Sequence, residues 1–554
     1  MVPMLMRPLR RAARRLPSPR FTALHGARRH AIVAALLLGS WAAGPVAQAQ
    51  AQEATPNALP ALGDAISQEL SPVAERRLGD RIMRSIRRDP DIVDDPLVQA
   101  YIEQLWRGLL VAGRLRGEIG PELDSAHAWT PFLIRDRSVN AFALPGGYIG
   151  VHLGLIAMTN TADELASVLA HELSHVTQRH IARMIGQQSR TSWVSIATMI
   201  AGILAASRNA QAAQALIYGG QAVTAQTQLN FSRDMEREAD RVGFGVLAQA
   251  GYDVAGMASM FEMLQQASRL NDDGSYPYLR THPLTSERIG DARARVGLAH
   301  DRAGPLASRP DGERAAWHAL MAARSRVLMD TRSVALQALL QQEAPANATP
   351  MQRVARHYTT MLAAQRGGAP SQAMAALAQA RDAARALPAV QQQVALRVLD
   401  LGEAENRLRD RQPAAAAEAL SRAIAAGASA DARPELLMAA QIALAAPPGV
   451  ARRAHAEQVA ERLQSQVSRQ PDDATAWTLL ASLWAELDQP VRAVRAEAEA
   501  VAALGDLPGA IERVQGARTR FRQPDAAEVI ELSVMDARMK AWMRQQRADL
   551  QDGS

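Results

Sequence analysis

The residue types and spacing that could do chemistry occur together at His171-Glu172-Leu173-Ser174-His175. Residues four apart on a helix share one face, so the imidazoles of His171 and His175 could bind one Zn²⁺. Glu172 would stand beside them, placed to take a proton from a water on the metal. The chain has 12 histidines, so chance produces such a motif on the order of 1% of the time. The alternative is a pair of core histidines, because the apolar segment LASVLA precedes the motif.

A third histidine ligand nearby in the chain is excluded by position. A metzincin-type site would need glycine and histidine at the positions of Gln178 and Ile181. His180 is one residue out of place. Because it follows His171 by nine residues, it is expected to point to the opposite side of the helix.

A carboxylate ligand is better supplied by the segment SRDMEREADRVG at 232–243. On a helix, Glu236 and Asp240 share one face and Glu238 faces elsewhere. Glu236 is then the third metal ligand, and Asp240 is an acceptor that orients a ligand histidine. The alternative is a salt-bridged surface helix, because arginines interleave the acids.

Two kinds of element must position these residues. Short β-branched and aromatic runs at 128–151, split by Pro145-Gly146-Gly147, predict strands joined by a turn. A helix is expected from Thr161, where Thr161-x-x-Glu164 has the capping-box spacing. The strand at 140–151 could be an edge on which substrate pairs, or an ordinary core hairpin.

These motifs carry a resemblance. HELSH, SRDMEREAD and YLRTHPLTSERI together resemble the HtpX/CAAX-prenyl-protease family of zinc metallopeptidases, which are gluzincins. The layout is similar to the periplasmic β-barrel assembly-enhancing protease branch of that family. The likeness is strong over 66–305 and extends to layout alone in the remainder. It implies a mainly α fold, with a gluzincin-type metalloprotease domain (α with a small β-sheet) followed by an α-helical tetratricopeptide-like repeat solenoid.

The resemblance also implies roles for residues. The family's glutamate ligand falls on Glu236, its aspartate on Asp240, and the histidine of its T-H-P motif on His282. His282 could close the fourth zinc position at rest, donate a hydrogen bond to the tetrahedral intermediate, or be a turn residue fixed by Pro283. The expected site is one Zn²⁺ per chain on His171, His175 and Glu236, with Glu172, Asp240 and His282 in catalytic roles.

The N-terminal segment has the pattern of a secretory signal peptide. Eight arginines and no acid occur in residues 1–49, and the apolar run Ala31–Gly44 precedes a small-residue cleavage site at Ala49. A membrane anchor is the alternative, but the run is short for a span of about 20 residues. Without those arginines the net charge of +6 becomes −2 for the remainder, which gives no reason to expect a nucleic-acid partner. The absence of cysteine excludes disulfides, thiolate zinc sites and cysteine nucleophiles.

Composition divides the remainder of the chain. Beyond about 310 it is alanine-rich, and Pro-led helix starts recur at 369–380, 412–423 and 489–500. The segment from Asp472 to Val501 resembles one tetratricopeptide repeat, although a generic helical bundle is the alternative. The expected parts are a signal peptide at 1–49, a zinc metalloprotease domain at 50–305 with a possible active-site cover at 191–223, a linker at 306–312, tetratricopeptide-like repeats at 313–520 and a C-terminal helical tail at 521–554.

The expected function is a periplasmic zinc-dependent endopeptidase. The resemblance implies misfolded or stalled outer-membrane β-barrel proteins as substrates, with the repeats binding substrate or docking on the β-barrel assembly machinery. The rival is a chaperone or assembly scaffold with latent protease activity, and a site-specific processing peptidase is a third option. No mature transmembrane helix is expected. The segment 191–223 could cover the cleft, contact the membrane or form a buried hairpin.

Overall fold

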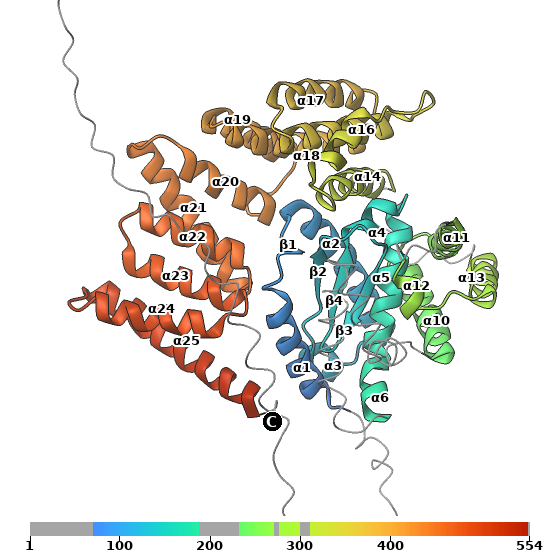
Figure 1. The fold of residues 1–554 in the computed structure, drawn as a ribbon, viewed down its shortest axis with the longest axis horizontal. Coiled ribbons are helices and arrows are strands. Elements are labelled where there is room, and N and C mark those ends of the chain that lie inside the picture. The colour runs from blue at the N-terminus through green and yellow to red at the C-terminus, as the bar shows by residue number, and fades with distance from the viewer. Residues whose placement is uncertain (1–69, 188–231, 271–275, 300–310, 552–554) are drawn as a thin grey trace, which may run out of the picture. The chain divides into compact units, whose positions relative to one another are not determined.

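A four-stranded sheet lies within the first half of the molecule (Figure 1). The computed structural model describes residues 70–187, 232–270, 276–299 and 311–551. The predicted signal peptide at 1–49, the predicted cover at 191–223 and most of the predicted linker lie outside these residues. All described residues belong to one compact unit, Asp64–Ser554.

The sheet has the order β1-β2-β4-β3. Its strands are β1 (Ile92–Val93), β2 (Thr130–Ile134), β3 (Ala141–Leu144) and β4 (Tyr148–His152). β2 and β4 are parallel, and β3 returns antiparallel to β4. The turn predicted at Pro145-Gly146-Gly147 joins them, and both glycines have the left-handed backbone (φ +78° and +81°) that side chains rarely adopt. β3 is therefore an edge strand among the described residues.

Helices cover both faces of this sheet. The helices of this part are α1 (Pro72–Ile86), α2 (Pro96–Leu115), α3 (Pro121–Ala126), α4 (Leu153–Met158), α5 (Ala162–Thr177), α6 (His180–Gln187), α10 (Arg233–Gln249), α11 (Ala255–Leu270), α12 (Tyr278–Thr281) and α13 (Ser286–Ala299). Phe132 and Ile134 point to α1, while Leu133 points to the core formed with α2 and α5. This alternation is the period-two pattern of a strand buried on both faces. The expected helical domain with a small sheet is confirmed.

The contact between α1 and the β3–β4 turn depends on Gly79. A Cβ atom built at Gly79 would lie 2.0 Å from the carbonyl oxygen of Pro145. We expect Gly79→Ala to lower the free energy of unfolding by about 1–3 kcal/mol, because helix and turn must separate. Thermal unfolding measures it, with Gly290→Ala in α13 as the matched control, where a Cβ would meet nothing within 4 Å. Equal unfolding temperatures for the two variants would contradict this packing.

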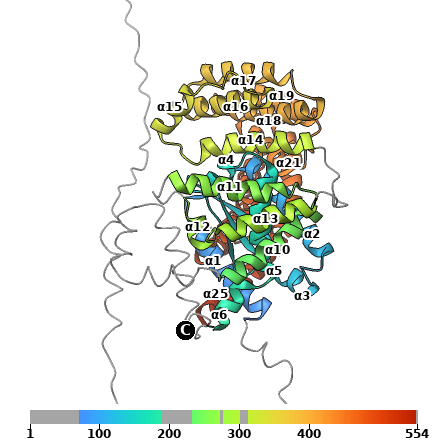
Figure 2. The ribbon, with the colours of Figure 1, turned by 90° about the vertical axis from the view of Figure 1, so that its right-hand side faces the viewer.

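The second half of the chain is entirely helical among its described residues. Its helices are α14 (Asp311–Leu328), α15 (Ser333–Gln341), α16 (Pro350–Arg366), α17 (Pro370–Ala384), α18 (Ala389–Arg409), α19 (Pro413–Ala425), α20 (Arg433–Ala445), α21 (Val450–Arg469), α22 (Ala474–Glu486), α23 (Pro490–Ala503), α24 (Leu507–Arg520) and α25 (Ala526–Gln551). Figure 2 shows α14, α16 and α17 in successive layers, and each packs against the next.

One turn conformation recurs between these helices. The N-caps of α17, α19 and α23 have φ of −112°, −113° and −111°, with ψ of 70°, 65° and 68°. The residue before each cap (Gly368, Arg411 or Asp488) is left-handed, and a proline follows the cap. These are the three Pro-led starts predicted from the sequence. The chain therefore repeats a helix-turn-helix unit, and its tetratricopeptide identity stays a prediction.

The hydrophobic core is continuous between the two halves. One cluster of buried side chains runs from Val93 to Ala503, and α14 packs against α4, α2 and α16. Arg324 of α14 is 3% exposed at its side chain and reaches both carboxylate oxygens of Asp95 at 2.8 and 2.9 Å. It also donates to the hydroxyl of Tyr358 at 3.0 Å and to Glu405 Oε1 at 2.6 Å. Asp95 in turn caps the N-terminus of α2 by accepting from the backbone of Val98.

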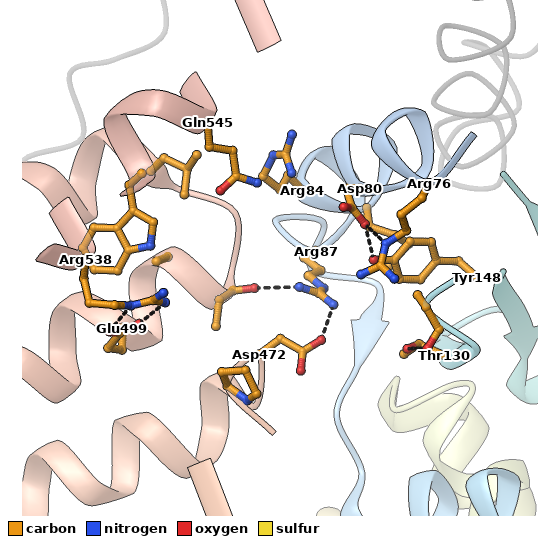
Figure 3. Close-up of a pocket in the computed structure, with 17 residues that line it drawn as sticks. Arg76, Asp80, Arg84, Arg87, Thr130, Tyr148, Asp472, Glu499, Arg538 and Gln545 are labelled. Atoms are coloured by element: carbon orange, nitrogen blue, oxygen red, sulfur yellow. Dashed lines mark hydrogen bonds and ion pairs between the residues drawn. The ribbon is translucent and has the colours of Figure 1, made fainter. Parts of the chain in front are cut away.

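A second contact joins α1 to the last helices around a cavity of about 410 Å³ (Figure 3). Each arginine that lines it has an acidic partner. The pairs are Arg76 with Asp80, Arg84 with Asp549, Arg87 with Asp472, and Arg538 with Glu499. The charges of this cavity are therefore matched.

No described helix is both long enough and apolar enough to be a membrane span.

Candidate metal centre

Helix α5 carries the HExxH motif through the middle of the core. The Thr161 side chain caps it by accepting from the backbone of Glu164 at 3.2 Å, as the sequence spacing predicts. Nearly every residue of α5 is buried, because α2, α10, α11 and β3 surround it. An apolar helix buried on all sides needs polar partners for its few polar groups, and His171 and His175 find them on one face.

The two histidines meet a carboxylate from α10. His171 Nε2 lies 3.0 Å from His175 Nε2, and the Glu236 oxygens lie 3.4 Å from each of them. All three side chains are at most 1% exposed. Two donors about 2.0–2.1 Å from a tetrahedral zinc ion are about 3.4 Å apart, so the spacing matches a shared ion. His171, His175 and Glu236 thus place three buried donor atoms around one point, as a metal site requires.

His282 brings a fourth donor to the same point. It follows α12, its ring stacks on Tyr278, and it is 1% exposed. Its Nδ1 lies 3.0 Å from Glu236 Oε1 and 3.4 Å from His171 Nε2. The ligand atoms of His171, His175, Glu236 and His282 all lie within 4.8 Å of one another. The predicted ligands and His282 therefore form one buried cluster.

Glu172 lies beside the cluster and is completely buried. Its Oε2 accepts a hydrogen bond of 3.0 Å from the backbone N–H of Ala143 in the edge strand β3. Among the residues that the structure describes, its Oε1 accepts no hydrogen bond, and it lies 3.5 Å from His282 Nε2. Burial raises the pKa of this carboxyl, while the nearby His282 and His171 oppose the rise. A carboxylate with one oxygen fixed and the other unbonded is suited to accept a proton.

Asp240 holds the opposite side of His171. Its Oδ1 lies 2.9 Å from His171 Nδ1, which is the contact predicted for an orienting acceptor. Burial of His171 disfavours its charged form, but the hydrogen bonds and charges of Asp240 and Glu236 outweigh burial and raise the pKa of this imidazole to about 9.

Arg288 links this network and was not predicted from the sequence. It is 4% exposed, and its Nε and Nη2 donate to Asp240 at 2.6 and 2.8 Å. Its Nη1 lies 2.8 Å from Glu236 Oε2 and donates to the carbonyl of Pro283, beside His282. One guanidinium thus fixes α10 against the segment that carries His282. The only sequence signal was an arginine shortly after the T-H-P motif.

His180 does not lie where the sequence placed it. The expectation that it points to the opposite side assumed that the helix continues, but α5 ends at Thr177 and Arg179 is left-handed (φ +53°). The bend returns His180 to His175, with 2.8 Å between the two Nδ1 atoms. His180 Nε2 lies 3.1 Å from Glu238 Oε2. If His175 Nδ1–H donates to His180 and His180 Nε2–H donates to Glu238, His175 Nε2 is an unprotonated donor on the cluster side.

We expect His180→Ala to weaken zinc binding about 10- to 100-fold, since His175 loses the partner that fixes its ring and tautomer. Competition with a zinc chelator at constant pH measures this effect. His180→Asn keeps a side-chain acceptor and should recover part of the affinity, and the exposed His455→Ala is the control. Unchanged affinity in His180→Ala would show that the contact does not support the metal.

Fold and donor cluster together are those of a metallopeptidase domain. Residues 117–296 match the family described as Peptidase family M48, so this part of the chain is an M48 peptidase domain. The match includes every residue of the cluster and does not extend into the second, helical half of the chain. The family resemblance seen in the sequence is confirmed for this domain.

Curated relatives agree over the same region. The beta-barrel assembly-enhancing protease of Escherichia coli (strain K12) is 35% identical over 264 residues, which are 47% of this chain and 51% of the relative. The protein of the same name from Yersinia pestis is 35% identical over 272 residues, 48% of this chain and 53% of the relative. The mitochondrial metalloendopeptidase OMA1 of Arabidopsis thaliana is 32% identical over 161 residues, 29% of this chain and 30% of the relative. The matches to the two beta-barrel assembly-enhancing proteases thus span about half the length of each.

Proposed function

We propose that this chain is a zinc-dependent endopeptidase that degrades misfolded or stalled proteins in the periplasm, outer-membrane β-barrel proteins among them. The observation that carries the proposal is the buried cluster of His171, His175, Glu236 and His282 with Glu172 beside it. Imidazole and carboxylate donors in tetrahedral spacing suit zinc. The names of the relatives support the link to β-barrel assembly.

The residues of the chain divide the work of hydrolysis. His171, His175 and Glu236 would hold zinc, which supplies a Lewis acid and makes a water acidic near neutral pH when bound. Glu172 Oε1 takes the proton of the attacking water and passes it to the leaving amine. The Ala143 N–H keeps the other oxygen in place, so the orientation of the base is set by the edge strand. Asp240 and Arg288 orient His171 and Glu236.

The location and the partners rest on other features. The signal-peptide pattern of residues 1–49 supports export to the periplasm. The repeated helix-turn-helix region is proposed as tetratricopeptide-like, and as the part that binds substrate or docks on the β-barrel assembly machinery.

A second function, a chaperone or scaffold with latent protease activity, is favoured by His282. Four protein donors complete the coordination of a zinc ion, so His282 would have to leave before a substrate could enter. His282→Ala separates the two roles: increased hydrolysis supports the latent form, and decreased hydrolysis supports a contact of His282 with the reacting groups.

The test of the proposed function is degradation of an unfolded outer-membrane β-barrel protein by the full chain. We expect cleavage to stop when a chelator removes the metal and to return when zinc is added. The folded form of the same substrate is the control and should resist. Cleavage that persists in chelator would refute the zinc mechanism, and equal cleavage of the folded form would refute the substrate class.

A further inference from the structure

A second cavity, of about 450 Å³, lies among α16, α18, α20 and the start of α2. Its wall is apolar on α18 and α20, where Leu401, Leu408, Leu437 and Met438 face it. Cavities of about 300–1,000 Å³ with an apolar wall and a few polar groups are typical of small-ligand sites. The volume is suited to one or two residues of a chain and not to a longer segment.

Two arginines at helix ends face this cavity. Arg366 ends α16 and Arg409 ends α18. Among the residues that the structure describes, neither guanidinium has a carboxylate within ion-pair distance. Burial lowers the pKa of Arg366, and the charges of Arg324 and Arg409 lower it further, against the opposing charges of Glu405 and Asp95. The positive charges of Arg324, Arg366 and Arg409 therefore repel one another in this cavity.

The acid in the cavity does not neutralise these two groups. Glu405 lines it, but its Oε1 and Oε2 are taken by Arg324 at 2.6 and 3.3 Å. Arg324 is in turn fixed by Asp95. The cavity beside α1 differs in this respect, because each of its arginines has an acidic partner. Figure 3 shows three of these pairs, those of Arg76, Arg87 and Arg538. We therefore expect an anionic ligand in the cavity among α16, α18 and α20, and not in the cavity beside α1.

We propose that this cavity binds the C-terminal residue of an unfolded polypeptide, with the α-carboxylate on Arg366 and Arg409 and an apolar side chain against Leu408 and Met438. Guanidinium groups pair with carboxylates by charge-assisted hydrogen bonds. The apolar wall of the cavity would pack against the side chain of the C-terminal residue of the peptide. Gln441, exposed on the rim, offers a donor and an acceptor that match a peptide bond and not an acyl chain. The nature of the ligand, a substrate chain, rests on the proposed function.

The test is equilibrium binding of short Gly/Ser peptides by fluorescence anisotropy. The protein is the full chain with Glu172→Gln, so that no peptide is cut. One peptide ends in phenylalanine with its carboxylate, the second ends in the same residue as an amide, and the third ends in serine. We expect the first to bind at least about tenfold more tightly than either of the others, since each loses the charge or the apolar contact.

Variants assign the difference to the cavity. Arg366→Gln with Arg409→Gln should remove the preference for the carboxylate and leave binding of the amide unchanged. Arg385→Gln with Arg513→Gln removes the same charge from exposed positions outside the cavity and should change nothing. Arg409→Glu alone, at an exposed position, reverses the charge without disturbing the core, and should weaken binding of the carboxylate peptide.

Several results would overturn the proposal. Equal binding of the carboxylate and the amide would do so without any variant. Retention of the preference in the double variant would place the site elsewhere. Binding of phosphatidylglycerol vesicles that depends on Arg366 and Arg409, with no peptide preference, would make the cavity a lipid site. Peptide binding without zinc-dependent hydrolysis would refute the proposed function alone, because no step of this assay uses the metal.

Discussion

Replacement of Glu172 by glutamine is expected to lower kcat by roughly two to four orders of magnitude while zinc remains bound. Glutamine has the shape of glutamate, and its carbonyl oxygen can accept the Ala143 N–H bond in place of Oε2. The amide nitrogen then takes the position of Oε1, which faces the cluster. Because an amide nitrogen has no basic lone pair, the attacking water keeps its proton.

The measurement is hydrolysis of an unfolded protein at saturating substrate, with zinc content determined for each preparation. Glu122→Gln, an exposed acid on α3, is the charge-matched control. If Glu172→Gln binds zinc and hydrolyses at the unaltered rate, then another group is the base or another protease is present. If it loses zinc, Glu172 is part of the metal site and its role must be revised.

The second large effect is on stability, at Arg324. We expect Arg324→Met to lower the free energy of unfolding by about 3–5 kcal/mol, because the buried Asp95 carboxylate loses its counter-charge. Methionine can fill the volume of the arginine stem, so the main change is the loss of the guanidinium contacts with Asp95, Glu405 and Tyr358. The double variant Asp95→Asn/Arg324→Met should recover part of the loss, since no unpaired charge stays between α2 and α14.

Thermal unfolding of the full chain measures this effect. Arg332→Met is the control, since Arg332 also pairs with an acid but is 73% exposed, and it should change stability little. Similar losses of unfolding free energy in Arg324→Met and Arg332→Met would mean that the buried Asp95–Arg324 pair stabilises the fold no more than an exposed pair does.

The same pair predicts a dependence on pH. Burial alone would raise the pKa of the Asp95 carboxyl, but the charge and hydrogen bonds of Arg324 lower it below its usual range. A lowered pKa in the folded state means that the stabilisation is complete above the unfolded value of about 4. It is lost as the pH falls through the folded value. Arg324→Met should therefore flatten the acid side of the stability profile.

Much of the metal site could be predicted because its spacing is local. His171 and His175, and likewise Glu236 and Asp240, are four residues apart, and a helix turns such spacing into a shared face. His282 was found through family resemblance alone, because nothing in its own segment indicates that it meets α5. Its place in the cluster depends on a contact over 111 residues of chain.

Two other contacts could not be predicted, for different reasons. The contact of His180 required knowing that the chain bends at Arg179, a left-handed residue that is not glycine. The role of Arg288 required knowing that α13 lies against α10. In the helical half, the Pro-led starts at 369–380, 412–423 and 489–500 predicted where α17, α19 and α23 begin. The close packing of α14 against the peptidase part had no sequence signal.

The hydrophobic core is continuous from Val93 to Ala503, so we expect the peptidase part and the helical part to unfold together. A metal bound in the peptidase part would then stabilise both parts. A ligand held only by the folded state, at a hundred times its Kd, adds about 2.7 kcal/mol to the free energy of unfolding. Because the peptidase part and the helical repeats share one core, that free energy is expected to slow amide hydrogen exchange in α22 as well as in α5. Zinc supply would then govern how long the repeat surface survives among other proteases, even though none of its residues binds the ion.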